Sequence, residues 1–143
     1  MDTCIFCKII NDKVGLLYET DRLVVILDKF PLSYGHLLVI PKSHCRFYHE
    51  MDDMDLKEIA CTIKKIVKTC GFEKYNVLQN NKHIQSVYHV HFHIIPCDFK
   101  INNNSDSIMG QGGLNIKWET LAINEEALKS LKKFIKDRFN EIR

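Results

Sequence analysis

The sequence contains no long apolar run, no strong excess of one charge and no start that looks like a leader. No apolar run approaches the ~18 residues that a membrane-spanning helix needs, which argues against a membrane span. The formal net charge is only +2, so the composition gives no reason to expect binding to nucleic acid or to an acidic membrane. The first residues show no basic segment followed by an apolar run, and we therefore expect no signal peptide. Internal repeats and linkers are also absent, and the one polar run, 102–107, is interpreted as a loop.

What is present suits one globular domain. A chain of 143 residues can bury a core, and 45% hydrophobic with 27% charged residues is ordinary for such a protein. There are six cysteines, and without a secretion signal we expect them to be reduced, in the cytoplasm, with the nucleus as a second location left open. Four of them are scattered among apolar neighbours and are interpreted as buried thiols: Cys45, Cys61, Cys70 and Cys97.

The most informative stretch is 86–96, in which His89, His91 and His93 alternate with apolar residues. Side chains alternate between the two faces of a strand, so this pattern predicts three imidazoles on one face and a buried apolar face behind them. Same-face neighbours lie roughly 6.5–7 Å apart, so one edge of a substrate could touch two imidazoles at once. Two other interpretations stay open, namely a plain half-exposed strand and a metal ion shared by all three histidines.

Cys4 and Cys7 form the one cysteine pair with informative spacing. Thr3 can cap a short helix beginning at Cys4, and residues three apart on a helix share a face. Two convergent thiolates suit Zn²⁺, although they supply only half of a tetrahedral site. Unoccupied buried cysteines and a redox pair are the alternatives, but the redox reading is weakened because the segment is not part of a βαβ unit.

The remaining patterns predict an α+β fold. Strands are expected at 16–19, 23–27, 37–41 and 75–79, and the continuous apolar run of 37–41 is typical of a strand buried on both faces. A long central helix of about five turns is expected to begin after the acidic residues 52–55, to end at Gly71 and to cover the sheet. Asn124 should cap a C-terminal helix over about 124–142. The loop 80–84 returns the chain to the histidine segment as a hairpin, so we predict an antiparallel sheet of about five strands.

Four stretches together resemble the histidine-triad (HIT) family. They are Cys4-Ile5-Phe6-Cys7-Lys8-Ile9, Gly35-His36-Leu37-Leu38-Val39-Ile40-Pro41-Lys42, Gln85-Ser86, and His89-Val90-His91-Phe92-His93-Ile94-Ile95. The match runs from about residue 4 to about residue 120, so we expect one HIT domain over 1–143. The Cys-x-x-Cys pair with His44 is similar to the zinc-binding Hint branch, whose members are small homodimers that hydrolyse nucleoside 5′-phosphoramidates of the AMP type.

The resemblance implies a role for each site residue. It makes His91 the nucleophile that forms a nucleotidyl-imidazole intermediate, with His93 and His36 as phosphate donors or supports and Ser86 as a proton relay. It implies a structural Zn²⁺ with four ligands, Cys4, Cys7, His44 and His89. It also implies a nucleotide pocket formed by Asn80, Gln85, Asp28, Phe6 and Ile26. Asp28 could instead simply cap a turn.

Two further functions remain open on the sequence. One is hydrolysis of dinucleoside polyphosphates, which is the activity of another branch of the family. The other is a zinc-stabilised nucleotide-binding or scaffold protein with little activity. The second is motivated by Lys82-His83-Ile84, which stands where the family usually has glycine or alanine. Glycine there would let a backbone N–H approach phosphate, so this loop bears on rate and substrate preference. We interpret His83 itself as a solvated loop residue.

Overall fold

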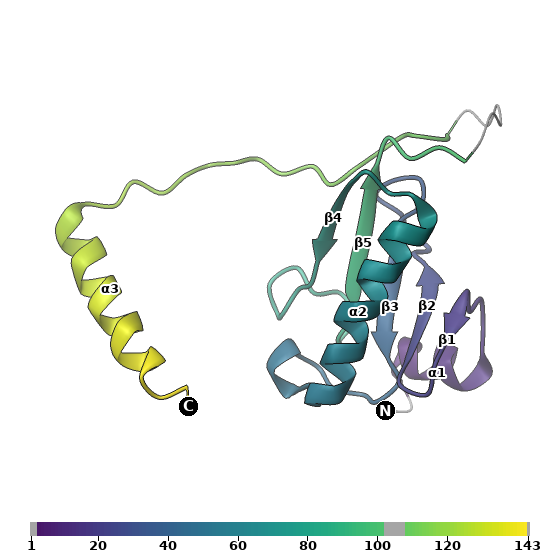
Figure 1. The fold of residues 1–143 in the computed structure, drawn as a ribbon, viewed down its shortest axis with the longest axis horizontal. Coiled ribbons are helices and arrows are strands. Elements are labelled where there is room, and N and C mark those ends of the chain that lie inside the picture. The colour runs from purple at the N-terminus through teal and green to yellow at the C-terminus, as the bar shows by residue number, and fades with distance from the viewer. Residues whose placement is uncertain (1–2, 102–107, 143) are drawn as a thin grey trace.

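The computed structural model describes residues 3–101 and 108–142, so the loop expected at 102–107 lies outside the described residues. A five-stranded, wholly antiparallel sheet has the strand order β1-β2-β3-β5-β4 (Figure 1). The elements along the chain are α1 (Ile5–Asp12), β1 (Tyr18–Glu19), β2 (Leu23–Leu27), β3 (Leu37–Pro41), the 3₁₀ turn η1 (Tyr48–Glu50), α2 (Asp53–Cys70), β4 (Lys74–Leu78), β5 (Phe92–Cys97) and α3 (Glu125–Phe139). The predicted α+β class with an antiparallel sheet is confirmed.

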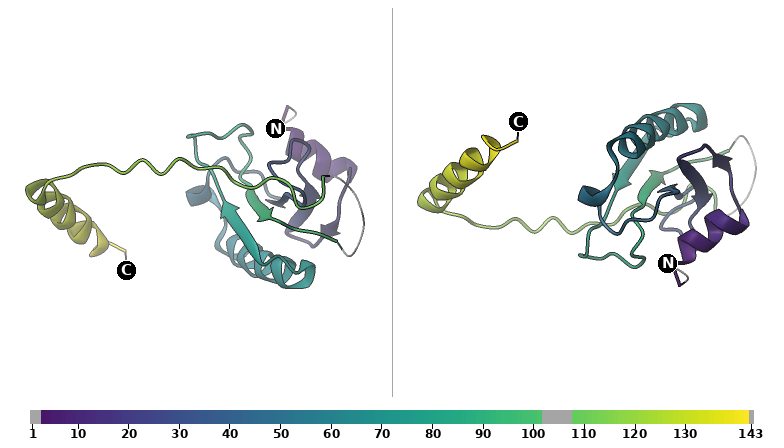
Figure 2. Two further views of the ribbon diagram at one scale, coloured as in Figure 1. Left: turned by 90° about the horizontal axis from the view of Figure 1, so that it is seen from above. Right: turned by 90° about the horizontal axis from the view of Figure 1, so that it is seen from below.

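The sheet is covered by a helix on each face, α2 on one and α1 on the other (Figure 2). Strands β2 and β3 are almost fully buried, and their side chains alternate between the two layers. Leu23, Val25 and Val39 pack with α2, whereas Val24, Ile26 and Leu38 pack with Phe6 of α1. Strand β3 is therefore buried on both faces, as its apolar run predicted.

Helix α2 has the boundaries that its end residues predicted. The Asp52 side chain accepts from the backbone N–H groups of Met54 and Asp55, and Gly71 ends the helix in the left-handed conformation with φ 74°. A cap of this kind stabilises a helix by about 1 kcal/mol. Helix α1 differs from the prediction, because Cys4 rather than Thr3 is its cap: the Cys4 thiol accepts from the Cys7 N–H.

The histidine segment is only partly a strand, which corrects the prediction of one extended segment over 86–96. Strand β5 begins at Phe92, so His89 and His91 lie before it in irregular chain. The Val90 N–H donates to the Cys45 carbonyl, which is outside the sheet and therefore draws this part of the chain away from the ladder. The alternation survives nevertheless, because Val90, Phe92 and Ile94 all enter the core beneath α2.

Three smaller predictions are also corrected. The first strand is limited to Tyr18–Glu19, and β4 lies one residue earlier than predicted. Among the cysteines expected to be buried, Cys61 and Cys70 on α2 are exposed, while Cys45 and Cys97 are half-buried.

The C-terminal part of the chain leaves the body of the protein. Residues after Gly113 form an extended segment that carries α3 well away from the sheet (Figure 1). Asn124 caps α3 as predicted, by accepting from the Ala127 N–H. The apolar face of α3 is exposed, with Leu131 at 46% and Phe134 at 57% of full exposure. Among the described residues, no helix is long and apolar enough to cross a membrane.

Candidate functional site

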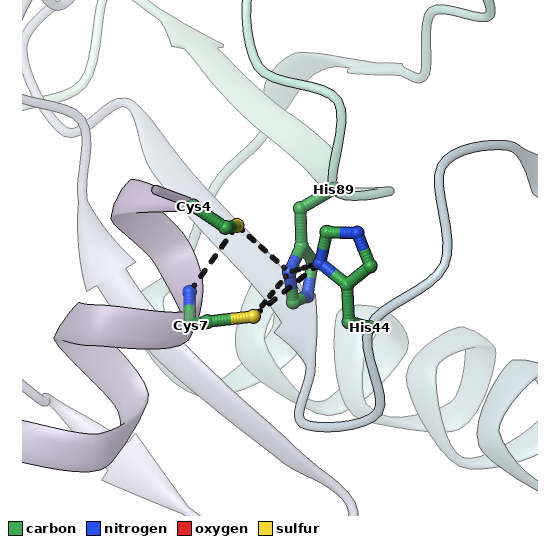
Figure 3. A group of neighbouring side chains, drawn as sticks. All are labelled: Cys4, Cys7, His44 and His89. Carbon is green, nitrogen blue, oxygen red and sulfur yellow. Dashed lines mark hydrogen bonds between the residues drawn. The ribbon is translucent and has the colours of Figure 1, made fainter. Parts of the chain in front are cut away.

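Four potential metal ligands converge where α1 meets the end of β3 and the histidine segment. They are Cys4, Cys7, His44 and His89, and their ligand atoms all lie within 4.8 Å of one another (Figure 3). The Nδ1 atoms of His44 and His89 are 3.1 Å apart, and His89 Nδ1 lies 3.5 Å from the Cys4 sulfur and 3.6 Å from the Cys7 sulfur. The Cys7 sulfur is 3.3 Å from His44 Nδ1. The group could therefore hold a metal ion.

These separations fit a tetrahedral ion. With bonds of ~2.0–2.1 Å to nitrogen and ~2.3 Å to sulfur, ligand atoms around zinc lie about 3.3–3.8 Å from one another. The tautomer of His89 fits as well: its Nε2 lies 2.8 Å from the Pro41 carbonyl, which can only accept, so Nε2 carries the proton. Nδ1 is left with a lone pair aimed at the other three ligands, as a metal ligand requires.

Burial shifts the pKa of two of these groups. The His89 pKa is lowered to about 4, mainly by its burial, so this ring stays neutral at physiological pH. Burial, followed by the hydrogen bond with the Cys4 thiol, raises the pKa of Cys7. A metal ion bound there would therefore have to displace the Cys7 proton.

His91 lies next to this cluster but is oriented differently. Its Nδ1 lies 2.7 Å from the His89 carbonyl, so Nδ1 donates and Nε2 keeps its lone pair. The ring is buried and meets the edge of Phe6 at a centroid distance of 4.9 Å. Burial lowers the pKa of His91, so the ring is held neutral with a bare Nε2. A neutral imidazole with its second nitrogen fixed by a carbonyl is able to act as a nucleophile.

His36 and His93 form a second imidazole pair beside His91. The strand register pairs Leu38 of β3 with His93 of β5. His36 lies directly before β3, and its Nε2 is 2.9 Å from His93 Nδ1. The His91 and His93 rings are 4.9 Å apart. Burial lowers the pKa of His36, and it lowers that of His93 to about 4 with help from the neighbouring imidazoles.

Asp28 caps a turn and also lies against the His36–His93 pair. Its Oδ1 accepts from the Phe30 N–H at 2.8 Å, which is the turn-capping arrangement. Its Oδ2 lies 3.3 Å from His36 Nε2 and 3.8 Å from His93 Nδ1. The carboxylate is therefore part of the imidazole cluster. Asp28 and His36 also line an open groove of about 590 Å³, which the loop 31–35 and Gly112 continue.

The other predicted pocket residues differ in how far they are buried. Phe6 and Ile26 are buried together in the α1 layer beside His91, Ser86 is exposed, and Asn80 is half-exposed. Gln85 is buried and its amide points inward, where it accepts from the Lys82 N–H and donates to the carbonyls of Arg46 and Val87. Its polar atoms thus hold the loop rather than face solvent.

Residues 82–84, which stand where the family usually has glycine or alanine, include two with unusual backbone angles. Lys82 and Ile84 have φ of 63° and 51°, the left-handed region that glycine adopts easily and a β-branched residue rarely. The Ile84 side chain is 70% exposed, so packing does not account for this conformation. The strained turn is stabilised by the Gln85 side-chain amide, whose oxygen accepts from the Lys82 N–H. His83 is exposed, in agreement with its interpretation as a solvated loop residue.

The structure adds backbone partners that sequence reasoning missed. The carbonyls of Pro41 and His89 and the Leu32 N–H each fix one imidazole. Every residue has such groups, so no residue type in the sequence could have indicated them.

The fold and the site together define a class: α+β proteins in which an antiparallel sheet presents neutral imidazoles beside a Cys₂His₂ cluster. The family model described as "HIT domain" matches residues 11–100. An adenosine 5′-monophosphoramidase of Schizosaccharomyces pombe is 43% identical over 133 residues, which covers 90% of this chain and 92% of that protein. The crystal structure of a histidine triad nucleotide-binding protein from Candida albicans is 33% identical, has a TM-score of 0.80 and covers 99% of this chain and 100% of that one.

The chain therefore belongs to the HIT family. The similarity to the two yeast enzymes extends over nearly the whole chain, since an adenosine 5′-monophosphoramidase of Saccharomyces cerevisiae is 38% identical over 133 residues, also 90% of this chain, and 82% of that protein. The extended C-terminal segment is thus included in the similarity.

Proposed function

We propose that this protein hydrolyses nucleoside 5′-phosphoramidates of the AMP type through a nucleotidyl intermediate on His91. The observation that carries the proposal is the 2.7 Å contact between His91 Nδ1 and the His89 carbonyl, which leaves His91 Nε2 with a lone pair. The names of the yeast relatives, adenosine 5′-monophosphoramidase, support the substrate class. Burial lowers the pKa of His91, which keeps the nucleophile unprotonated at neutral pH.

The reaction divides into two displacements at phosphorus. In the first, a bond forms between His91 Nε2 and phosphorus, the phosphorus–nitrogen bond breaks, and the amine leaves with a proton from the site. In the second, water attacks phosphorus and returns a proton to the site, the bond to Nε2 breaks, the nucleoside monophosphate is released and neutral His91 is regenerated. Two displacements, each assisted by a positioned group, thus replace one difficult direct attack of water on phosphorus.

His93 and Ser86 are the groups we assign to proton and phosphate handling. Because His93 Nδ1 faces His36 Nε2, its other nitrogen is available to donate to a phosphate oxygen. Ser86 is exposed, and its hydroxyl can relay a proton to the departing amine. His36 supports His93, and we assign Asn80 to the phosphate or ribose.

The nucleoside is expected to lie against the apolar side of His91. Phe6 and Ile26 line that side. Asp28 can accept from ribose hydroxyls with Oδ2, the oxygen that also lies near His36. We assign Gln85 to shaping the phosphate side of this pocket by holding the loop, since its amide atoms are already hydrogen-bonded within the protein.

Release of AMP from adenosine 5′-phosphoramidate tests this function. The native chain should release AMP, and His91→Ala should abolish release while leaving the far-ultraviolet circular dichroism unchanged. His83→Ala is the matched control, because His83 is an exposed histidine of the neighbouring loop, and it should keep the native rate. Undiminished turnover in His91→Ala would refute the proposal.

A nucleotide-binding protein with little activity remains the second candidate, because the left-handed Ile84 stands where a backbone N–H would approach phosphate. Calorimetric binding of AMP, without hydrolysis of several phosphoramidates, would favour it. Hydrolysis of diadenosine polyphosphates in preference to phosphoramidates would instead favour the other enzymatic branch.

We also propose that the Cys₂His₂ cluster holds a structural Zn²⁺. Two thiolates with two imidazoles are the donor set zinc prefers, and four protein ligands leave no position for a reacting water. The ion would tie α1, which carries Phe6, to the chain just before His91. Two thiolate ligands require reduced cysteines, and for this reason we place the protein in the cytoplasm.

Finally, we propose that the chain is a single domain over 1–143 that forms a homodimer. Strand β4 is an exposed sheet edge with Tyr75 and Val77 outward, and α3 presents an apolar face with no partner among the described residues. A second copy would cover both features.

A further inference from the structure

The backbone N–H of Leu32, in a loop far from His93 in the sequence, donates to His36, and His36 in turn contacts His93. We propose that Gly112 is a positioning residue: it lets its loop close on Leu32, whose N–H fixes the proton of His36 and, through His36, that of His93. The inference rests on the proposed function only in giving His93 the task of donating to phosphate.

The first link is the Leu32 N–H, which donates to His36 Nδ1 at 3.0 Å. A backbone N–H can only donate, so His36 Nδ1 must carry a lone pair, and the neutral ring holds its proton on Nε2. His36 is 2% exposed, so water does not compete for this nitrogen.

The second link joins the two imidazoles. His36 Nε2 lies 2.9 Å from His93 Nδ1, and only one hydrogen can lie between them. Because His36 supplies it, His93 Nδ1 accepts, and the proton of neutral His93 is on Nε2. The Asp28 carboxylate, 3.3 Å from His36 Nε2, favours the same arrangement, since it also needs a donor at that nitrogen.

The third link holds the Leu32 peptide in place. Gly113 N–H donates to the Leu32 carbonyl at 3.0 Å, Tyr34 N–H donates to the Gln111 carbonyl at 2.9 Å, and Ser33 and Gly112 form an antiparallel bridge. The two segments approach so closely that a Cβ on Gly112 would lie 2.3 Å from the Leu32 carbonyl oxygen and 2.6 Å from Ser33 Cα. Both contacts are with the backbone of the Leu32–Ser33 peptide, so a side chain at 112 must push the two segments apart. That movement shifts Leu32, whose own N–H lies in the adjoining peptide.

Moving Leu32 so that its N–H no longer reaches His36 Nδ1 would free His36 to carry its proton on Nδ1. Nε2 would then face His93 Nδ1 as a second acceptor, and His93 would have to move its own proton to Nδ1. His93 Nε2 would become an acceptor and could no longer donate to phosphate. Loss of one such donor or acid typically costs about 10²-fold or more in rate.

Side-chain ¹⁵N NMR of the full chain at pH 7 tests the ring protons directly. In the native protein, both His36 and His93 should show the proton on Nε2. In Gly112→Ala, the two rings should become tautomer mixtures or shift to Nδ1–H. Gly15→Ala is the control: Gly15 also has positive φ, 66°, but no atom lies within 4 Å of its Cβ position, so both rings should stay as in the native protein.

Rates measured in a double-mutant cycle separate positioning from general damage. Gly112→Ala should lower kcat by about tenfold or more with KM changed by about twofold at most. In His36→Gln, the glutamine amide can donate to His93 without the Leu32 N–H, so adding Gly112→Ala to it should cost about twofold or less. Equal losses from Gly112→Ala in the two backgrounds would overturn the inference, as would unchanged tautomers in Gly112→Ala.

If Gly112→Ala does not fold, Leu32→Pro removes the same N–H directly. In Leu32→Pro, the His93 proton should leave Nε2, and a persistent Nε2–H would contradict the proposal. The NMR measurement needs no turnover, so a native protein that fails to hydrolyse phosphoramidates would refute the proposed function alone.

Discussion

At the scale of single residues, the site depends on imidazoles that are buried in their neutral forms. His36, His89, His91 and His93 all have a lowered pKa, with burial as the main cause in each. Desolvation disfavours the charged ring, and only His36, His91 and His93 have a carboxylate, that of Asp28, near enough to oppose it. The four rings are therefore neutral at neutral pH, which is the state that the proposed nucleophile His91 and the proposed donor His93 require.

These shifts predict that acid destabilises the fold. The His93 pKa is about 4 in the native protein and about 6.5 in an unfolded chain, so between these values the unfolded state binds more protons. The contribution of His93 to the free energy of unfolding is therefore complete above about pH 6.5 and falls as the pH approaches 4. Urea unfolding from pH 7.5 to pH 4.5 should show a smaller loss of stability in His93→Asn than in the native chain. Parallel curves for the two proteins would contradict this account.

At the scale of elements, much of the fold could be predicted from local sequence. Asp52 and Gly71 mark the ends of α2, Asn124 marks the start of α3, and the apolar run of β3 indicates burial on both faces. The start of β5 could not be predicted, because the residues from Ser86 to His91 alternate as a strand does. The Val90 N–H instead donates to the Cys45 carbonyl outside the sheet, and this pairing depends on long-range packing.

The site was predictable to a similar degree. The residue types of the Cys₂His₂ cluster and of the imidazole group follow from motifs, and the structure brings both sets together. The inward orientation of Gln85 and the strained Ile84 were not predictable, because both depend on how a short loop closes.

The element that would depend most on the proposed zinc ion is α1, because its N-cap residue and its first turn carry the two cysteines. Cys7→Ala should leave the purified protein with less than one zinc per chain by atomic emission and should lower its melting temperature by several degrees, because the ion would no longer hold α1 on the sheet. Cys61→Ala removes an exposed thiol of α2 and should change neither value. Full stability of Cys7→Ala, or a native protein purified without zinc, would count against a structural ion.

At the scale of the whole molecule, the conspicuous feature is the C-terminal arm, residues 114–139, which packs on little of its own chain (Figure 1). Trp118 and Leu121 are each 84% exposed on the extended segment, and Phe139 is 64% exposed at the end of α3. Large apolar side chains gathered on one exposed part of a chain are typical of an interaction surface. The edge strand β4 leaves a further row of backbone groups unpaired on the side toward which the arm extends (Figure 1).

Association through this arm can be tested by sedimentation equilibrium. The native chain should have twice the mass of one chain at micromolar concentration. Phe134→Asp, on the apolar face of α3, should shift it toward monomer by placing a charge in the interface. Lys132→Asp changes a solvated position of the same helix and should leave the dimer intact. A native chain that remains monomeric at high concentration would be inconsistent with a dimer.

The central claim is that His91 Nε2 bonds to phosphorus, and rapid-quench mass spectrometry tests it most directly. The native protein is mixed with adenosine 5′-phosphoramidate, quenched within milliseconds at alkaline pH and digested. We predict an adenylyl group on the peptide that contains His91, formed and lost at rates compatible with turnover. AMP release without any adduct on that peptide, or an adduct on a different histidine, would contradict the account.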